Sequence, residues 1–376
     1  MKFLLIYVPN LRFSSFADPF RIYTLKEVLQ RISFPVTVDE NKLYYQIGIR
    51  SHSKGIFYKE AEIGKQIGNK RIFWIEPNCL ILNIVFAWEQ AVAKTSEKEV
   101  GMVASHRFPM YKVLNNSLDY IVDFFKTEKG KQLLQMASPG GAGRNKTLNQ
   151  DFFLNSKIYL PSLNEQLKTT ELIELIEDRI ETQIKIIDDY NSLKMGIYNC
   201  MFKENYADYK LKQLAYIVKG DQINNDQLLS NGSYYMMNGG TSPSGYLDSY
   251  NVSENTISIS EGGNSCGYVQ FNSCPFWSGG HCYTIQNVNS ALIENKYLYH
   301  YLKYKEKEIM NLRIGTGLPN IQKKDLENFT ILVPSLLIQR KNLALFEMLD
   351  EKISILNEEL ANLQKQKKYL LCNMFI

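Results

Sequence analysis

Apolar residues recur three and four positions apart in two long stretches of the chain. In the first stretch this seam comprises Ile173, Ile176, Ile180, Ile187 and Ile197, with Gln183, Tyr190, Lys194 and Met201 at the intervening positions. In the second it comprises Phe346, Leu349, Ile353, Leu356, Leu360, Leu363 and Leu370, with Lys367 and Met374. A period near 3.5 residues over about four heptads predicts a coiled coil rather than a surface helix. Each rod would be roughly 60 Å long, and its obvious partner is the other one.

The two stretches are copies of one another. Residues 158–202 align with residues 331–375 without a gap, so that Pro161-Ser-Leu matches Pro334-Ser-Leu and Met201-Phe matches Met374-Phe. A matched lysine, Lys194 or Lys367, interrupts each seam. Such a lysine either fixes the register of the pair or lies at a frayed end with its aliphatic stem on apolar surface. The duplication predicts that the chain between the copies is duplicated too.

The remaining chain forms two regions with the same plan. Strand-like runs occur at 43–49, 71–75 and 79–86, and helical spacing at 118–136 ends at Pro139-Gly-Gly. In the second region, helical spacing at 291–310 precedes the glycine loop 315–320 and the run 325–333. We therefore predict an α+β protein with an internal pseudo-twofold repeat. Two mixed α/β domains, 1–157 and 204–334, are separated by two long antiparallel helices, 158–203 and 335–376, that form a coiled coil.

Composition narrows the class only slightly. The 376 residues favour two to three domains, and no run of about 18 apolar residues predicts a membrane span. Six scattered cysteines without an export signal lead us to expect reduced thiols and a cytoplasmic location. Residues 1–157 hold 22 Lys and Arg against 14 Asp and Glu, whereas residues 204–334 hold 10 against 12. A basic first domain suits a polyanion, but charge alone would not have selected nucleic acid.

Catalytic and metal-binding motifs are weak. Gly140–Thr147 approximates a phosphate-binding loop, but Asn145 stands at the position of its final Gly and a helical run precedes it. The spacings of Cys266, Cys274, His281 and Cys282 match no common zinc knuckle. Asp18-Pro-Phe lacks the second Pro of a methyltransferase base-gripping motif, and the four histidines have no evident nucleophile partners. We expect no catalytic residue and no metal site, which favours a binding protein.

Several motifs resemble one family. Pro161-Ser-Leu-Asn-Glu-Gln166 and Pro334-Ser-Leu-Leu-Ile-Gln339, each followed by a heptad helix ending in Met-Phe, resemble the two conserved regions of Type I restriction–modification specificity (S) subunits. The stretches 9–16, 238–246 and 315–326 resemble further segments of that family. The sequence departs from the pattern at Ile338, where the first copy has Glu165. The loop that begins at Gly140 also lacks the Pro-Asn of the second loop.

The resemblance implies a non-enzymatic DNA-recognition subunit. Its two target-recognition domains would each read half of an asymmetric, interrupted sequence in double-stranded DNA. Two modification (methyltransferase) subunits would bind S-adenosylmethionine and methylate adenine, restriction subunits would use ATP and Mg²⁺, and this chain would bind no cofactor or membrane itself. Two alternatives stay open. One is the recognition subunit of a related multi-subunit system that cuts on both sides of its site, and the other is a coiled-coil scaffold that holds two protein-binding domains.

Candidate DNA contacts are the polar and basic residues of loops, because Arg, Lys, Asn, Gln, Ser and Thr read base edges and cations contact phosphates. In the first domain these are Arg50, Ser51, Lys54, Lys70, Arg71, Arg107, Arg144 and Lys146. In the second they are Asn238, Thr241, Ser244, Tyr246, Ser278, His281, Arg313, Asn320, Lys323 and Lys324.

Overall fold

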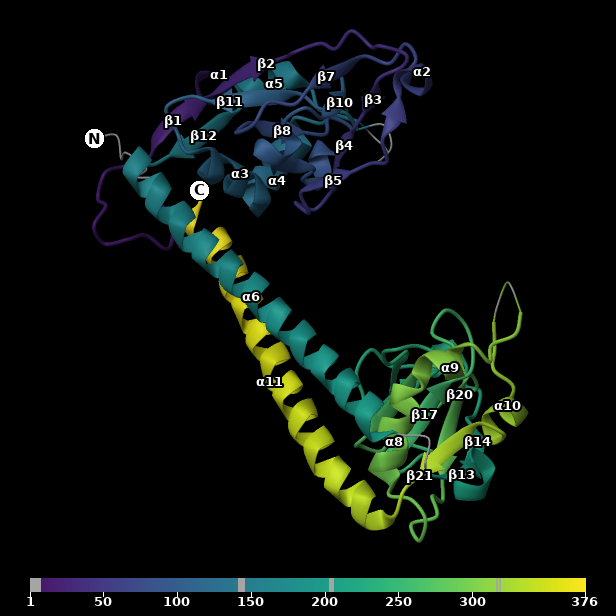
Figure 1. Ribbon diagram of the computed structural model, residues 1–376. Helices are drawn as coiled ribbons and strands as arrows, with labels where there is room; N and C mark the ends of the chain where they lie inside the picture. The colour runs from purple at the N-terminus through teal and green to yellow at the C-terminus, as the bar shows by residue number, and fades with distance from the viewer. Residues whose placement is uncertain (1–7, 141–145, 203–205, 316, 318) are drawn as a thin grey trace. The chain divides into compact units, whose positions relative to one another are not determined.

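The computed structural model describes residues 8–140, 146–202, 206–315, 317 and 319–376. The chain divides into two compact units, of which unit 1 comprises Met1–Gln183 with Glu359–Ile376 and unit 2 comprises Ile184–Glu358. The division passes through both long helices, α6 (Leu163–Met201) and α11 (Leu336–Met374) (Figure 1). Each unit therefore combines a globular part with one end of the helix pair.

Unit 1 is built on a four-stranded antiparallel sheet of β2 (Leu29–Ile32), β11 (Met110–Val113), β8 (Leu80–Leu82) and β9 (Val92–Lys94), in that order. Four two-stranded ribbons accompany it: β1 (Arg21–Thr24) with β12 (Lys157–Leu160), β7 (Ile72–Trp74) with β10 (Val103–Ser105), β3 (Leu43–Tyr44) with β6 (Glu62–Ile63), and β4 (Ile47–Ile49) with β5 (Ile56–Tyr58). The helices are α1 (Leu25–Val28), α2 (Gly64–Ile67), α3 (Leu118–Lys126), α4 (Glu128–Met136) and α5 (Gln150–Asn155).

Unit 2 repeats this plan. Its sheet orders β14 (Tyr216–Lys219), β20 (Cys282–Gln286), β17 (Thr256–Ser260) and β18 (Val269–Asn272), and β13 (Ala207–Lys210) pairs with β21 (Thr330–Val333). A second sheet contains β16 (Gly245–Leu247), β15 (Tyr234–Met237) and β19 (Trp277–Ser278). The helices are α7 (Leu211–Leu214), α8 (Asn295–Tyr304), α9 (Glu306–Met310) and α10 (Lys323–Glu327).

The repeated glutamine at the start of each long helix holds the helix to its own unit. In unit 1 the Gln166 side chain accepts from the Ser117 N–H at 2.9 Å and donates to the Pro161 carbonyl at 3.0 Å. In unit 2 the Gln339 side chain accepts from the Glu294 N–H at 2.8 Å and donates to the Pro334 carbonyl at 2.8 Å. Both glutamines are buried. A buried amide with all of these bonds fixes the direction in which the helix leaves the domain.

The repeated Met-Phe ends are core residues. Phe375 stacks on Tyr120 of α3 with ring centroids 4.7 Å apart in unit 1, and Phe202 packs on Tyr297 of α8 at 5.5 Å in unit 2. Both phenylalanines are nearly fully buried in the main core of their unit. The signature at the end of each helix is thus an aromatic anchor that closes the core of the globular part.

The predicted elements are mostly confirmed, with four differences. The helical run 291–310 is two helices, α8 and α9, and the strand-like run 43–49 is two strands, β3 and β4. The helical run 118–136 is two helices, because the Thr127 hydroxyl donates to the Phe124 carbonyl at 2.7 Å and accepts from the Gly130 N–H at 3.1 Å, which ends α3 and caps α4. The apolar run 79–86 is a strand only at Leu80–Leu82, after which the chain turns into a 3₁₀ helix at Ala87–Glu89. Within the described part of the chain, we find no helix that combines the length and apolarity of a membrane span.

Candidate nucleic-acid interface

Four of the residues predicted to contact DNA in the second domain converge on one cavity of unit 2. Asn238, Ser244, His281 and Asn320 line a space of about 610 Å³. They come from three places: the chain after β15, the segment that joins β19 to β20, and the glycine loop before α10. Its other lining residues are Lys219, Gly239, Gly240, Glu261, Gly262, Gly263 and Pro319. Its size lies within the range of small-ligand pockets.

Glycine makes this cavity possible on the side of β15. Gly239 has φ +79°, a backbone conformation that L side chains rarely adopt, and a Cβ added there would lie 3.2 Å from the His281 Cβ. The Asn238 Oδ1 accepts from the His281 N–H at 2.9 Å, so the two loops are tied together. The stretch Asn238–Tyr246, singled out from the sequence, therefore forms one wall beside His281.

A buried carboxylate forms the floor of the cavity. The Glu261 Oε1 accepts from the Lys219 Nζ at 2.5 Å and from the Tyr283 hydroxyl at 3.3 Å. Its Oε2 is buried without a hydrogen-bond partner and lies 3.4 Å from the His281 Nδ1. Burial, with the charge of Glu261, raises the pKa of Tyr283 to about 12, so its hydroxyl stays a donor. Neither Lys219 nor Glu261 was predicted from the sequence, because isolated charged residues carry no motif.

The other candidates of the second domain lie apart from this cavity. Thr241, Arg313, Lys323 and Lys324 are exposed, and Tyr246 lies on β16 opposite Tyr235. Ser278 is only 1% exposed, so its hydroxyl does not reach the surface at which it was expected.

The candidates of the first domain form two groups. His106 N–H donates to the Arg71 carbonyl at 3.2 Å, which brings the exposed Arg71 and Arg107, with the neighbouring Lys70, to one end of β7 and β10. The second group surrounds the turn between β4 and β5 and the 3₁₀ helix: Arg50 lies over the Phe57 ring, Ser51 donates to Glu89, and Lys146 lies over the Trp88 ring at 4.8 Å. Lys54 is exposed on the same turn, and Arg144 lies outside the described residues.

The cysteines of the weighed zinc pattern lie in different environments. Cys266 and Cys282 are buried, and burial raises the pKa of the Cys282 thiol to about 11, whereas Cys274 is exposed. Across the ranges that the structure describes, no three His, Cys, Asp or Glu side chains are grouped so as to hold a metal ion.

Every predicted seam position on the long helices is buried or half-buried, and the positions between them are mostly exposed. In unit 1, Glu177 pairs with Lys367 at 2.6 Å and Gln183 donates to Glu359 at 3.0 Å, so the two helices run antiparallel. In unit 2, Lys194 pairs with Asp350 and the Tyr198 ring meets the Phe346 ring, again antiparallel.

The two seam lysines have equivalent acidic partners, since Glu177 and Asp350 occupy the same position of the repeat. Burial opposes ionisation of Glu177, but Lys126 and Lys367 outweigh it and lower its pKa. The Lys194 side chain is only 14% exposed. These pairs favour a role in fixing the register over a lysine that extends into solvent at a frayed end.

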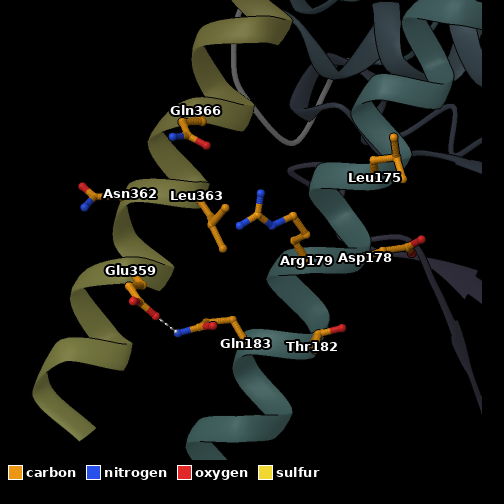
Figure 2. Close-up of a pocket in the computed structure, with 9 residues that line it drawn as sticks. All are labelled: Leu175, Asp178, Arg179, Thr182, Gln183, Glu359, Asn362, Leu363 and Gln366. Atoms are coloured by element: carbon orange, nitrogen blue, oxygen red, sulfur yellow. Dashed lines mark hydrogen bonds between the residues drawn. The ribbon is translucent and has the colours of Figure 1, made fainter. Parts of the chain in front are cut away.

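Between the helices of unit 1 lies a groove of about 530 Å³ (Figure 2). The Arg179 side chain points from α6 into the space between the helices, toward Leu363 of α11. Asp178, Thr182, Gln183, Glu359, Asn362 and Gln366 add polar groups around it, and the side chain of Leu175 is more than half exposed. In this groove of unit 1, the space between the two helices is therefore lined by polar as well as apolar side chains.

Part of the chain is similar in sequence to proteins of one family. Residues 203–365 match the family described as the Type I restriction modification DNA specificity domain. A putative type I specificity subunit of Mycoplasma pneumoniae is 34% identical over 155 residues, which cover 41% of each protein. A similar subunit of Mycoplasma genitalium is 32% identical over 127 residues, 34% of this chain and 33% of the relative. The matched region thus spans about two-fifths or less of the length of these relatives.

Solved structures extend the likeness to the whole fold. The crystal structure of a Type I restriction–modification S subunit from M. genitalium superposes with a TM-score of 0.65 at 16% identity and covers 98% of this chain and 99% of that one. A chain from a study of complex assembly and conformational transition in a type I restriction–modification system gives a TM-score of 0.61 at 17% identity, covering 94% of this chain and 96% of that one. The expected arrangement of two mixed α/β domains and two long helices is confirmed.

Proposed function

We propose that the chain is a Type I restriction–modification specificity subunit, the DNA-recognition subunit of such a system. Each globular part reads one half of an interrupted sequence in double-stranded DNA. The chain itself supplies no catalytic group; its role is to select where partner subunits methylate adenine or start cleavage.

One observation carries this proposal: the two units share a framework but not a surface. The sheets have the same strand order, and β1 pairs with β12 in the register in which β13 pairs with β21. The cavity of unit 2, in contrast, holds Lys219, Glu261 and His281, and strand register places Ser33, Ile84 and Arg107 at the equivalent positions of unit 1. Two equivalent scaffolds with different contact surfaces suit a target that has two dissimilar halves.

The helix pair is the proposed docking surface for two modification subunits. Its exposed apolar side chains include Leu167 and Leu175 in unit 1 and Leu193 and Met348 in unit 2. They occupy helix faces that also carry charged residues, and such mixed faces are typical of protein interfaces. S-adenosylmethionine would bind to the modification subunits, and ATP with Mg²⁺ to restriction subunits that join the complex.

The test is to express the chain with its modification subunits in cells without other adenine methylation and to sequence the methylated sites. We expect one motif of two defined halves separated by a spacer of fixed length. A matched culture with the modification subunits alone should show no such motif. A continuous motif, or methylation that is independent of this chain, would contradict the proposal.

A further inference from the structure

The side chains of Lys219, Glu261 and His281 form a network in which one buried carboxylate accepts from Lys219 at 2.5 Å and lies 3.4 Å from the His281 Nδ1. The Glu261 side chain is 10% exposed, whereas those of Lys219 and His281 are 51% and 61% exposed. A buried carboxylate needs partners, and here Lys219 and Tyr283 both donate to its Oε1, while the His281 Nδ1 lies 3.4 Å from its Oε2. Lys219 and His281 both line the cavity. Glu261 therefore fixes where the Lys219 ammonium is placed.

The backbone around this network is held by hydrogen bonds to neighbouring segments. The Glu261 N–H donates to the His281 carbonyl at 2.9 Å, and the Glu261 carbonyl accepts from the Ile321 N–H at 2.9 Å. Lys219 ends β14 and lies opposite Tyr283 of β20. A charged group on such a support keeps its geometry without a ligand, which lowers the entropic cost of binding one.

The network does not belong to the shared framework. On the core face of the sheet Ile285 pairs with Ile217 and Ile257, and in unit 1 Tyr111 pairs with Arg31 and Leu80 in the same way. By this register the counterparts of Lys219, Glu261 and His281 are Ser33, Ile84 and Arg107. A carboxylate that only stabilised the fold would serve both units equally, so the network is a feature of unit 2 alone.

Few cations come from the strands around Lys219. The sequence contains no Lys or Arg between Lys219 and Lys296, a segment that supplies most strands of unit 2. Because Glu261 compensates its charge, Lys219 is poorly suited to attract a phosphate, which needs net positive potential. Its remaining N–H donors suit a neutral ligand that offers acceptors.

We propose that the mouth of this cavity faces the major-groove edge of one guanine of the half-site read by unit 2, that Lys219 donates to the guanine O6 and N7, and that Glu261 is its positioning residue. The proposal rests on the proposed function. Guanine presents two acceptors and no donor in the major groove, and lysine bound to O6 and N7 is among the commonest specific contacts to a base.

The experiment uses the full complex of the chain with its modification subunits and a duplex that carries the methylated motif. Each guanine of the half-site is replaced in turn by 7-deazaguanine, which lacks N7, or by 2-aminopurine, which lacks O6. At one guanine the replacement should weaken binding about 5- to 150-fold. The Lys219→Met complex should bind the unmodified duplex more weakly by a similar factor. Replacing that guanine should then not weaken the binding of the variant any further.

Glu261→Gln should lose the discrimination between that guanine and its analogues, while the first half-site is still read. The control Glu254→Gln removes an exposed carboxylate of the same unit and should keep this discrimination. The inference is overturned if, at every guanine, Lys219→Met and the base replacement each weaken binding independently, so that the two fold-losses multiply when both changes are present. So would a uniform loss for all sequences with a salt slope reduced by about one, which marks a phosphate contact. A wild-type complex without a bipartite motif would instead refute the proposed function.

Discussion

His300 makes the stability of unit 2 dependent on pH. The imidazole is 2% exposed on α8, and its Nδ1 lies 2.8 Å from the hydroxyl of Tyr198. Burial raises the pKa of Tyr198, so the phenol stays protonated and donates to the unprotonated Nδ1. Burial, together with the nearby Lys194 ammonium, lowers the pKa of His300 to about 3. The folded unit therefore holds a neutral histidine.

The sign of the effect follows from these values. The pKa of His300 is lower in the folded unit than its ordinary value of 6.5, so the unfolded chain binds a proton that the folded unit excludes. Stability is complete above pH 6.5 and falls as the pH drops below it. At pH 5 the free energy of unfolding should be lower by about 2 kcal/mol than at pH 8 from this group alone.

The assay needs a probe that reports on unit 2. The chain has three tryptophans, and replacement of Trp74 and Trp88 by Phe leaves Trp277, which lies on β19 of unit 2. Urea unfolding followed by its fluorescence gives the free energy at pH 8 and pH 5. In His300→Asn, which keeps an acceptor near the position of Nδ1 but cannot titrate, the difference between the two pH values should shrink by about 2 kcal/mol.

His106→Asn removes an exposed histidine of unit 1 and should leave the pH dependence seen by Trp277 unchanged. The reasoning is wrong if His300→Asn retains the full loss of stability between pH 8 and pH 5. The reasoning is also wrong if His300→Asn lowers the free energy of unfolding by the same amount at pH 8 and at pH 5 relative to the parent protein.

Three further predictions concern the ion pairs, the helices and the loops. Arg12 binds Glu165 through two nitrogens at 2.7 Å, and the Glu165 side chain is 4% exposed. Arg12→Met should therefore lower the stability of unit 1 by about 3–5 kcal/mol in calorimetry, and adding Glu165→Leu should restore much of it; no restoration would show that the pair is not the cause. Removal of one heptad from each long helix, at positions that face one another, should shorten the spacer of the methylated motif by about three base pairs or prevent assembly, since seven residues span roughly 10 Å. An active complex with an unchanged spacer contradicts the role of the helices as a ruler. The last prediction concerns the loop cations Arg144, Lys146, Lys323 and Lys324. Their substitution by Gln should reduce the salt slope of DNA binding by up to about 0.9 for each phosphate contact that is lost. An unchanged slope would place these residues away from the phosphates.

The sequence by itself determined the repeat, the fold class and the seam. A coiled-coil seam is a local pattern, because positions three and four apart share one helix face whatever the partner is. The matched Pro-Ser-Leu and Met-Phe ends marked where each helix meets its domain, and Gln166 and Phe375 show why those residues recur. Strand positions such as Leu80–Leu82 were found for the same reason, since β-branched and apolar runs reflect local burial.

Only the tertiary structure decided which charged residues meet. Arg12 and Glu165 are 153 residues apart, and Lys219 at the end of β14 and Glu261 just after β17 are 42 apart. Nothing in the local pattern distinguishes Lys219 from a solvated lysine, and Ser278 had the residue type of a base reader but not the exposure. Such pairings depend on strand register and on the packing of distant segments, which a single sequence does not reveal. The repeat in the long helices thus predicted the framework, and the cavity between β15, β17 and β20 was decided by how the strands assemble.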